Sequence, residues 1–126
     1  MRFNYVIKKM EYIVALILPF FILLIENFLP YPYIIEELFK YYLAKSANST
    51  KSAIILGLLF SISEAIFYVM NLNSSPIRIL IVAPMHITTI LVMRYFLRSS
   101  FAIKKKLWPV GIIIAIIIHY LFNQSN

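Results

Sequence analysis

The sequence has 126 residues, of which 62% are hydrophobic and 13% are charged, with a formal net charge of +7 and no cysteine. Soluble domains carry about 25% charged residues, so this composition indicates an integral membrane protein, with a single domain over residues 1–126. The lack of cysteine excludes disulfides, thiolate zinc sites and a thiol nucleophile. We interpret the basic excess as charge that flanks membrane spans, not as a nucleic-acid surface.

Five apolar segments follow one another along the chain. A membrane span needs about 20 mostly apolar residues. The third and fourth segments meet this requirement clearly, whereas the second and fifth are short or interrupted by charge. We therefore expect an all-α, integral membrane helical bundle of about five transmembrane or partly re-entrant helices. The segments are Tyr12–Phe28, Tyr31–Ser46, Ala53–Leu72, Ile77–Leu97 and Trp108–Phe122.

Basic residues gather in alternate loops, and this pattern predicts the orientation of the chain. The other two loops carry no basic residue, with Arg78 as the one nearby exception. We expect a multi-pass protein of the cell membrane with a cytoplasmic N-terminus and a C-terminus outside. The basic clusters are Arg2, Lys8 and Lys9, then Lys45 and Lys51, then Arg98, Lys104, Lys105 and Lys106.

The second segment holds two of the five carboxylates in the chain, Glu36 and Glu37, followed by Lys40. Residues three or four apart share a helix face, so both acids can reach Lys40. A solvated helix end with one salt bridge would explain this pattern. The large apolar neighbours favour a functional interpretation, because a charge at the centre of a span costs about 2.5–3.5 kcal/mol.

The next two segments carry Glu64 and His86. Glu64 has no lysine or arginine near it on its own helix. A buried carboxylate there has to be protonated, bound to a metal or paired with another helix. A neutral acid bonded to Ser61 or to a backbone carbonyl is the simpler alternative for Glu64. His86 has a simple alternative too, since a lone histidine in an apolar helix is often a satisfied core residue.

The last segment carries His119 and Asn123, which are four residues apart and therefore face the same way. A polar tip at the membrane interface would explain this pair. With a rise of about 1.5 Å per residue, however, the acids and histidines of all four segments fall within the outer half of one membrane. Carboxylates and imidazoles can activate water directly or around a metal, and histidine with asparagine can stabilise an oxyanion.

Four short motifs appear in order on four successive segments. They are Glu36-Glu37-x-x-Lys40, then Gly57-x-x-Phe60-x-x-x-Glu64 with Tyr68, then Arg78 with Met85-His86, then His119-x-x-x-Asn123. This ordered set resembles the PrsW family of membrane proteases. It is similar, at greater distance, to the CAAX-prenyl protease and bacteriocin-processing superfamily. Glu64 stands where that broader group has a histidine, which favours PrsW.

The resemblance implies an intramembrane peptidase that hydrolyses a membrane-associated protein near the outer leaflet, typically an anti-sigma factor. It places the base on the Glu36–Glu37 pair and an oxyanion donor at Asn123. The implied catalytic residues are Glu36, Glu37, Glu64, His86, His119 and Asn123. If a divalent metal such as zinc takes part, Glu64, His86 and His119 are the ligands we expect, because carboxylate and imidazole both suit zinc.

Several alternatives stay open at this point. Either Glu36 or Glu37 can be the base, and water can be activated with or without a metal. The chain is shorter than typical PrsW members, so a catalytically inactive membrane partner or immunity protein on the same scaffold is the alternative function. A small proton carrier that uses Glu64 is a weaker option. We expect a protein or peptide substrate and the lipid bilayer as partners, no nucleic acid, and either a monomer or an oligomer.

Overall fold

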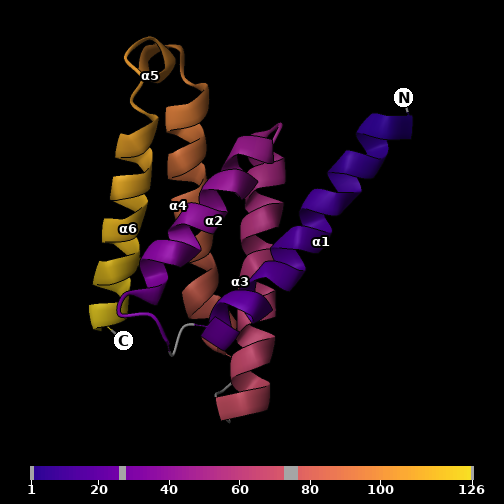
Figure 1. Ribbon diagram of the computed structural model, residues 1–126, viewed down its shortest axis with the longest axis vertical. Helices are drawn as coiled ribbons and strands as arrows, with labels where there is room; N and C mark the ends of the chain where they lie inside the picture. Colours follow the sequence, from indigo (N-terminus) through magenta and orange to yellow (C-terminus); the bar gives the residue numbers. More distant parts are fainter. Residues whose placement is uncertain (1, 26–27, 73–76, 126) are drawn as a thin grey trace.

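The computed structural model describes residues 2–25, 28–72 and 77–125, and within these ranges it contains helices and no strand. This confirms the predicted all-α bundle. Figure 1 shows the five long helices packed side by side and one short helix at the end of the bundle. The helices are α1 (Arg2–Ile25), α2 (Pro32–Ser46), α3 (Thr50–Leu72), α4 (Arg78–Arg98), α5 (Ser100–Lys104) and α6 (Trp108–Ser125).

The long helices agree with the predicted segments, and the differences have local causes. Helix α1 starts at Arg2, ten residues before the predicted start at Tyr12, and its first turns include the basic N-terminal residues. Proline is tolerated in the first turn of a helix, and Pro32 is the first residue of α2. The short helix α5 was not predicted.

Three of the described helices are long and apolar enough to cross a membrane: Thr50–Met70, Ile79–Arg98 and Trp108–Ser125. They lie in α3, α4 and α6. The apolar part of α1, Met10–Ile25, is shorter. Helix α2 has 15 residues and spans about 22 Å, which is less than the hydrocarbon core of about 30 Å. The chain is a helical membrane protein in which α2 is a short helix between longer ones.

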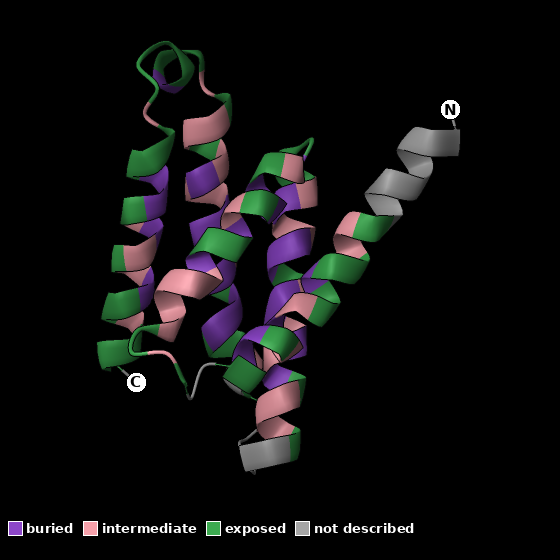
Figure 2. Ribbon diagram, in the orientation of Figure 1, coloured by how far each residue is buried: buried purple, intermediate pink, exposed green. Residues whose placement is uncertain are grey.

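Burial follows the faces of the helices. Figure 2 shows the buried residues on the sides that look into the bundle and the exposed residues on the outside. The outer surface is itself apolar: Met70 is 74% exposed, Leu80 70% and Leu121 59%. Large exposed apolar surfaces of this kind are expected where lipid, and not water, surrounds the helices.

Helices α3 and α4 approach each other closely at Gly57. A Cβ atom on Gly57 would lie 2.8 Å from the Cα atom of Ile87, closer than packed atoms allow. Small residues permit such close approach of helices in membranes. Ile87 follows His86 directly, and Glu64 lies about two turns after Gly57 on the same side of α3. The contact therefore brings the part of α3 that carries Glu64 next to His86.

Two arginines of α4 hold the end of α2. Arg94 Nε donates to the carbonyl of Ala47 at 3.3 Å, and Arg98 donates to the carbonyl of Lys45 at 3.0 Å. The last carbonyls of a helix lack partners within it, and basic side chains can supply them. These contacts fix the position of α2 against α4.

Candidate functional site

Four helices bring polar side chains to one place in the bundle. These residues, which we call the Glu/His/Lys cluster, are Glu36, Glu37 and Lys40 of α2, Glu64 of α3, His86 of α4 and His119 of α6. Polar and ionisable groups inside a membrane bundle are costly unless they are paired, and they commonly mark functional positions. The juxtaposition predicted from the segment depths is therefore present for five expected site residues and for Lys40.

Lys40 is fully buried, with 0% of its surface exposed. Its Nζ atom donates to Glu37 Oε1 at 2.6 Å and lies 2.7 Å from Glu36 Oε1. It also lies 5.0 Å from the centre of the Phe60 ring, on α3. The spacings of three and four residues place both acids and the lysine on neighbouring positions of one helical surface. Lys40 therefore forms an ion pair with both carboxylates at once.

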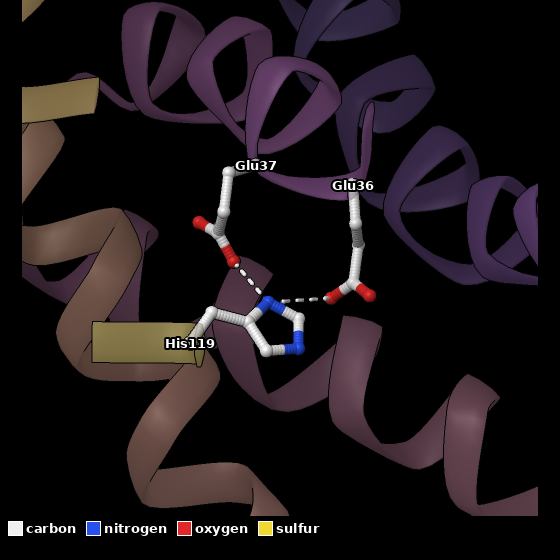
Figure 3. Close-up of side chains that lie close together, drawn as sticks. All are labelled: Glu36, Glu37 and His119. Atoms are coloured by element: carbon white, nitrogen blue, oxygen red, sulfur yellow. Dashed lines mark hydrogen bonds and ion pairs between the residues drawn. The ribbon is translucent and has the colours of Figure 1, made fainter. Parts of the chain in front are cut away.

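His119 joins α6 to the acid pair of α2. Figure 3 shows its ring between the two carboxylates, with Nδ1 directed toward both. Nδ1 lies 2.7 Å from Glu37 Oε1 in a hydrogen bond and 3.8 Å from Glu36 Oε1. An ionised carboxylate can only accept a hydrogen bond, so Nδ1 carries the hydrogen and donates a hydrogen bond to Glu37. This leaves Nε2 of a neutral His119 as an acceptor that points away from Glu37.

His86 lies between two other carboxylates. Its Nε2 atom is 2.5 Å from Glu64 Oε2, and its Nδ1 atom is 3.3 Å from Glu36 Oε1. With Glu64 ionised, Nε2 is the donor, and Nδ1 of the neutral ring then carries a lone pair. Among the described residues, Nδ1 of His86 and Oε1 of Glu36 are both buried without a hydrogen-bond partner. Two acceptors that face each other in this way are suited to hold a cation or a shared proton.

The two acids of α2 differ in their surroundings. Glu37 is fully buried, and its Oε1 atom accepts hydrogen bonds from both Lys40 and His119. The side chain of Glu36 is 14% exposed, and its Oε1 atom faces Lys40 and both histidines without a hydrogen bond to any described residue. Glu37 Oε1 therefore holds two neighbours, while Glu36 Oε1 and Glu37 Oε2 are buried oxygens without a hydrogen bond to a described residue.

The charges of the cluster do not balance. Glu36 and Glu37 share the single lysine of the cluster, so the acid pair and Lys40 together carry a formal charge of −1 when both acids are ionised. Uncompensated charge is costly to bury in an apolar bundle. A proton or a bound cation would offset it.

Two groups in the described part of the chain have the geometry to hold a metal ion. One is Glu36, Glu37 and His119, and the other is Glu36, Glu64 and His86. The predicted ligands Glu64, His86 and His119 are divided between these groups, and Glu36 belongs to both. Carboxylate oxygen with imidazole nitrogen is a donor set that suits zinc and related ions. Glu36 Oε1 and His86 Nδ1, which face each other, supply an oxygen and a nitrogen of this donor set.

Several expected and unexpected residues complete the description. Asn123 is exposed and makes no hydrogen bond or ion pair with a described residue, so its role stays a prediction. The side chain of Arg78 lies outside the described ones. Two neighbours were not predicted: the Tyr33 ring lies 6.0 Å from the His119 ring, and Thr89 Oγ1 donates to the carbonyl of His86 at 3.1 Å. Their sequence signal is only a spacing of three residues from Glu36 and His86.

Comparisons of the chain with models of protein families, with curated proteins and with solved structures found no match.

Proposed function

We propose that the chain is an intramembrane peptidase that hydrolyses a membrane-associated protein substrate with its Glu/His/Lys cluster. One observation carries the proposal: three carboxylates, two histidines and a buried lysine from four helices meet inside an apolar bundle, and Glu36 Oε1 lies between Lys40 and His86. Carboxylates and imidazoles placed within about 3 Å of one another can move the proton of an attacking water. The resemblance to the PrsW family supports the same reaction class.

Glu36 is the residue we assign as the general base. Its side chain is 14% exposed whereas Glu37 is fully buried, and its Oε1 atom faces His86 Nδ1 at 3.3 Å. In this mechanism Glu36 Oε1 takes a proton from water as the water oxygen bonds to the scissile carbonyl carbon. The same proton passes to the leaving amide nitrogen when the C–N bond breaks. The products are a new carboxyl terminus and a new amino terminus.

The remaining residues hold the base and its surroundings in place. Lys40 pairs with both Glu36 and Glu37, and its positive charge favours the ionised form of these acids inside the bundle. Glu64 accepts from Nε2 of His86 and so directs Nδ1 of that ring toward Glu36. Glu37 accepts from Nδ1 of His119 and so fixes the orientation of that ring. Asn123, one turn after His119, is the residue we assign to the developing oxyanion, because its side-chain amide can donate.

The residues also fit a divalent cation such as zinc. Glu36 Oε1 and His86 Nδ1 would hold it, because these two acceptors face each other at 3.3 Å and belong to a group with metal-binding geometry. Glu64 behind Nε2 would then complete the carboxylate–histidine arrangement found at many metal sites. When bound, such an ion supplies Lewis-acid polarisation of a carbonyl oxygen.

We propose that this chemistry lies near the outer leaflet. The connection between α2 and α3, helix α5 and the start of α1 lie at one end of the bundle, and the C-terminus lies at the other (Figure 1). The first end carries the basic clusters, so we propose that it faces the cytoplasm. Glu36 is the fifth residue of α2 and His119 lies six residues before Ser125, which puts the cluster toward the opposite end.

Substrate identification tests the proposal. Membranes that contain the wild-type chain or the Glu36→Gln variant are incubated with a membrane proteome, and new amino termini are labelled and sequenced. The proposal expects termini that form only with the wild type and lie near the outer end of substrate spans. A catalytically inactive membrane partner would produce the same set of termini with both proteins, and that result would refute the assignment.

A further inference from the structure

The short helix α5 joins two membrane-length helices at one end of the bundle. Figure 1 shows α5 nearly end-on, so its axis lies across the axes of α4 and α6. Ala102 is fully buried, and its backbone N–H donates to the Ser99 hydroxyl at 3.1 Å. Leu107 N donates to the carbonyl of Ala102 at 2.9 Å. One side of α5 is therefore fixed against the bundle just beyond the ends of two spans.

The other side of α5 combines apolar and basic side chains. Phe101 is 58% exposed and Ile103 is 56% exposed. The three residues Lys104, Lys105 and Lys106 are exposed as well. Lys105 Nζ lies 4.9 Å from the centre of the Phe101 ring, which brings charge and apolar surface together. We call these five residues the α5 surface. Such a combination is typical of segments that lie in the membrane interface.

The positive charge of the α5 surface has no acidic counterpart. The sequence contains no Asp or Glu after Glu64. None of the three lysines forms an ion pair with a described residue. The nearby arginines are engaged elsewhere, because Arg94 and Arg98 donate to carbonyls at the end of α2. The ammonium groups of the α5 surface are thus available to an external anion.

Lys106 has a backbone conformation that favours glycine. Its φ angle is 51°, and it is the one residue other than glycine with positive φ in the described ranges. Left-handed backbone is strained for a residue with a Cβ atom, and glycine would relieve that strain. A lysine at this strained position suggests that its ammonium group has a functional role.

We propose that the α5 surface binds the phosphate headgroups of anionic phospholipids in the leaflet that it faces. Phe101 and Ile103 insert among the acyl chains next to the headgroups, and the three lysines pair with phosphate. Each basic residue near a membrane surface strengthens binding to anionic lipid by about fivefold. We therefore expect the three lysines to enrich anionic lipid around α5 by up to about 100-fold.

The single tryptophan of the chain makes this enrichment measurable. Trp108 lies two residues after Lys106 and is 47% exposed. The full chain is reconstituted into phosphatidylcholine vesicles that contain a few per cent of brominated phosphatidylglycerol or brominated phosphatidylcholine. Bromine quenches tryptophan fluorescence at short range, so quenching reports which lipid lies beside Trp108. Quenching is compared among the wild type, a Lys104→Gln/Lys105→Gln/Lys106→Gln variant and a Lys45→Gln/Lys51→Gln control.

The proposal expects much stronger quenching by brominated phosphatidylglycerol than by brominated phosphatidylcholine in the wild type and in the control. The triple variant should lose this preference. Lys106→Gly should fold at least as stably as the wild type, and its preference for phosphatidylglycerol should be about fivefold weaker. This variant keeps the test valid if the triple variant misfolds. Equal quenching by both lipids in the wild type, or a preference that survives the triple variant, would overturn the proposal. Displacement of the lipid by inorganic phosphate, but not by chloride of equal ionic strength, would identify a soluble anion as the ligand and overturn it too.

Discussion

His86 Nδ1 faces Glu36 Oε1 at 3.3 Å, and neither buried atom makes a hydrogen bond to a described residue. The other nitrogen of His86 is held by Glu64 at 2.5 Å. Lys40 Nζ lies 2.7 Å from the same Glu36 oxygen and offsets its charge. The lone pairs of Glu36 Oε1 and His86 Nδ1 still face each other, and a proton or a metal ion between them would make this contact favourable. Glu36 and His86 are therefore suited to transfer a proton or to bind a cation.

Metal content tests whether the cluster holds a cation. The facing acceptors Glu36 Oε1 and His86 Nδ1 predict about one divalent ion per chain in protein purified without chelator, measured by elemental analysis. His86→Ala should remove the ion, and Glu64→Gln should weaken its binding by about 10–100-fold. The matched control Glu11→Gln, outside the cluster, should bind like the wild type. A wild type without bound metal would show that the cluster holds no ion, and an equal metal content in His86→Ala would place the ion elsewhere.

Removing Lys40 should destabilise the protein strongly. Lys40→Met leaves Glu36 and Glu37 buried beside each other without their shared cation, and loss of one partner of a buried pair costs about 3–5 kcal/mol. Thermal unfolding in detergent, followed by helical circular dichroism, measures the loss. Adding Glu37→Gln to the variant should restore part of the stability. The exposed Lys45→Met serves as the control, and an effect of equal size there would contradict the assigned role of Lys40.

The close contact between α3 and α4 should tolerate no side chain at Gly57. In Gly57→Ala the new Cβ atom would meet backbone atoms of Ile87 at 2.8 and 3.1 Å, so the helices have to separate. Overpacking of this kind costs about 1–3 kcal/mol. Gly111→Ala should have a similar cost, because its new Cβ atom meets the Cβ atom of Phe96 at 2.9 Å and a Cβ atom moves only with its backbone. Thermal midpoints should fall for both variants, and an unchanged midpoint for Gly57→Ala would contradict the close contact between α3 and α4.

The two acids of α2 should respond differently to loss of charge. Glu36→Gln should keep the thermal midpoint within a few degrees of the wild type, because Lys40 keeps Glu37 as its ion-pair partner and the Glu36 side chain is partly exposed. Glu37→Gln should lower the midpoint clearly, because Glu37 is fully buried and accepts from Lys40 and His119. Equal midpoints for the two variants would remove the distinction between a base and a positioning residue.

The helices and the residues of the cluster could be predicted because they depend on local properties. Apolar runs predict the long helices, and the spacing of Glu36, Glu37 and Lys40 predicts their shared surface. Helix α5 could not be predicted, since Ser100–Lys104 has five residues and no apolar run of its own. Its one sequence signal is the helix-capping residue Ser99, whose hydroxyl accepts from Ala102.

The pairing of the site residues depends on how the helices rotate against one another, and this is a long-range property. The sequence places Glu64 and His119 at similar depth, but it does not show that they belong to different carboxylate–histidine groups. That separation follows from contacts such as Gly57 with Ile87. The same contacts make Glu36 the residue common to both groups.

Cleavage by purified protein tests the central claim most directly. The chain, its Glu36→Gln variant and the matched Glu11→Gln control are reconstituted into liposomes with a fluorogenic library of transmembrane peptides. We predict that the wild type and Glu11→Gln cleave the same peptides at equal rates and that Glu36→Gln is about 10²–10⁴-fold slower, the range for loss of a general base. Equal rates for all three proteins, or no cleavage by the wild type, would contradict the assignment of Glu36 as the base of an intramembrane peptidase.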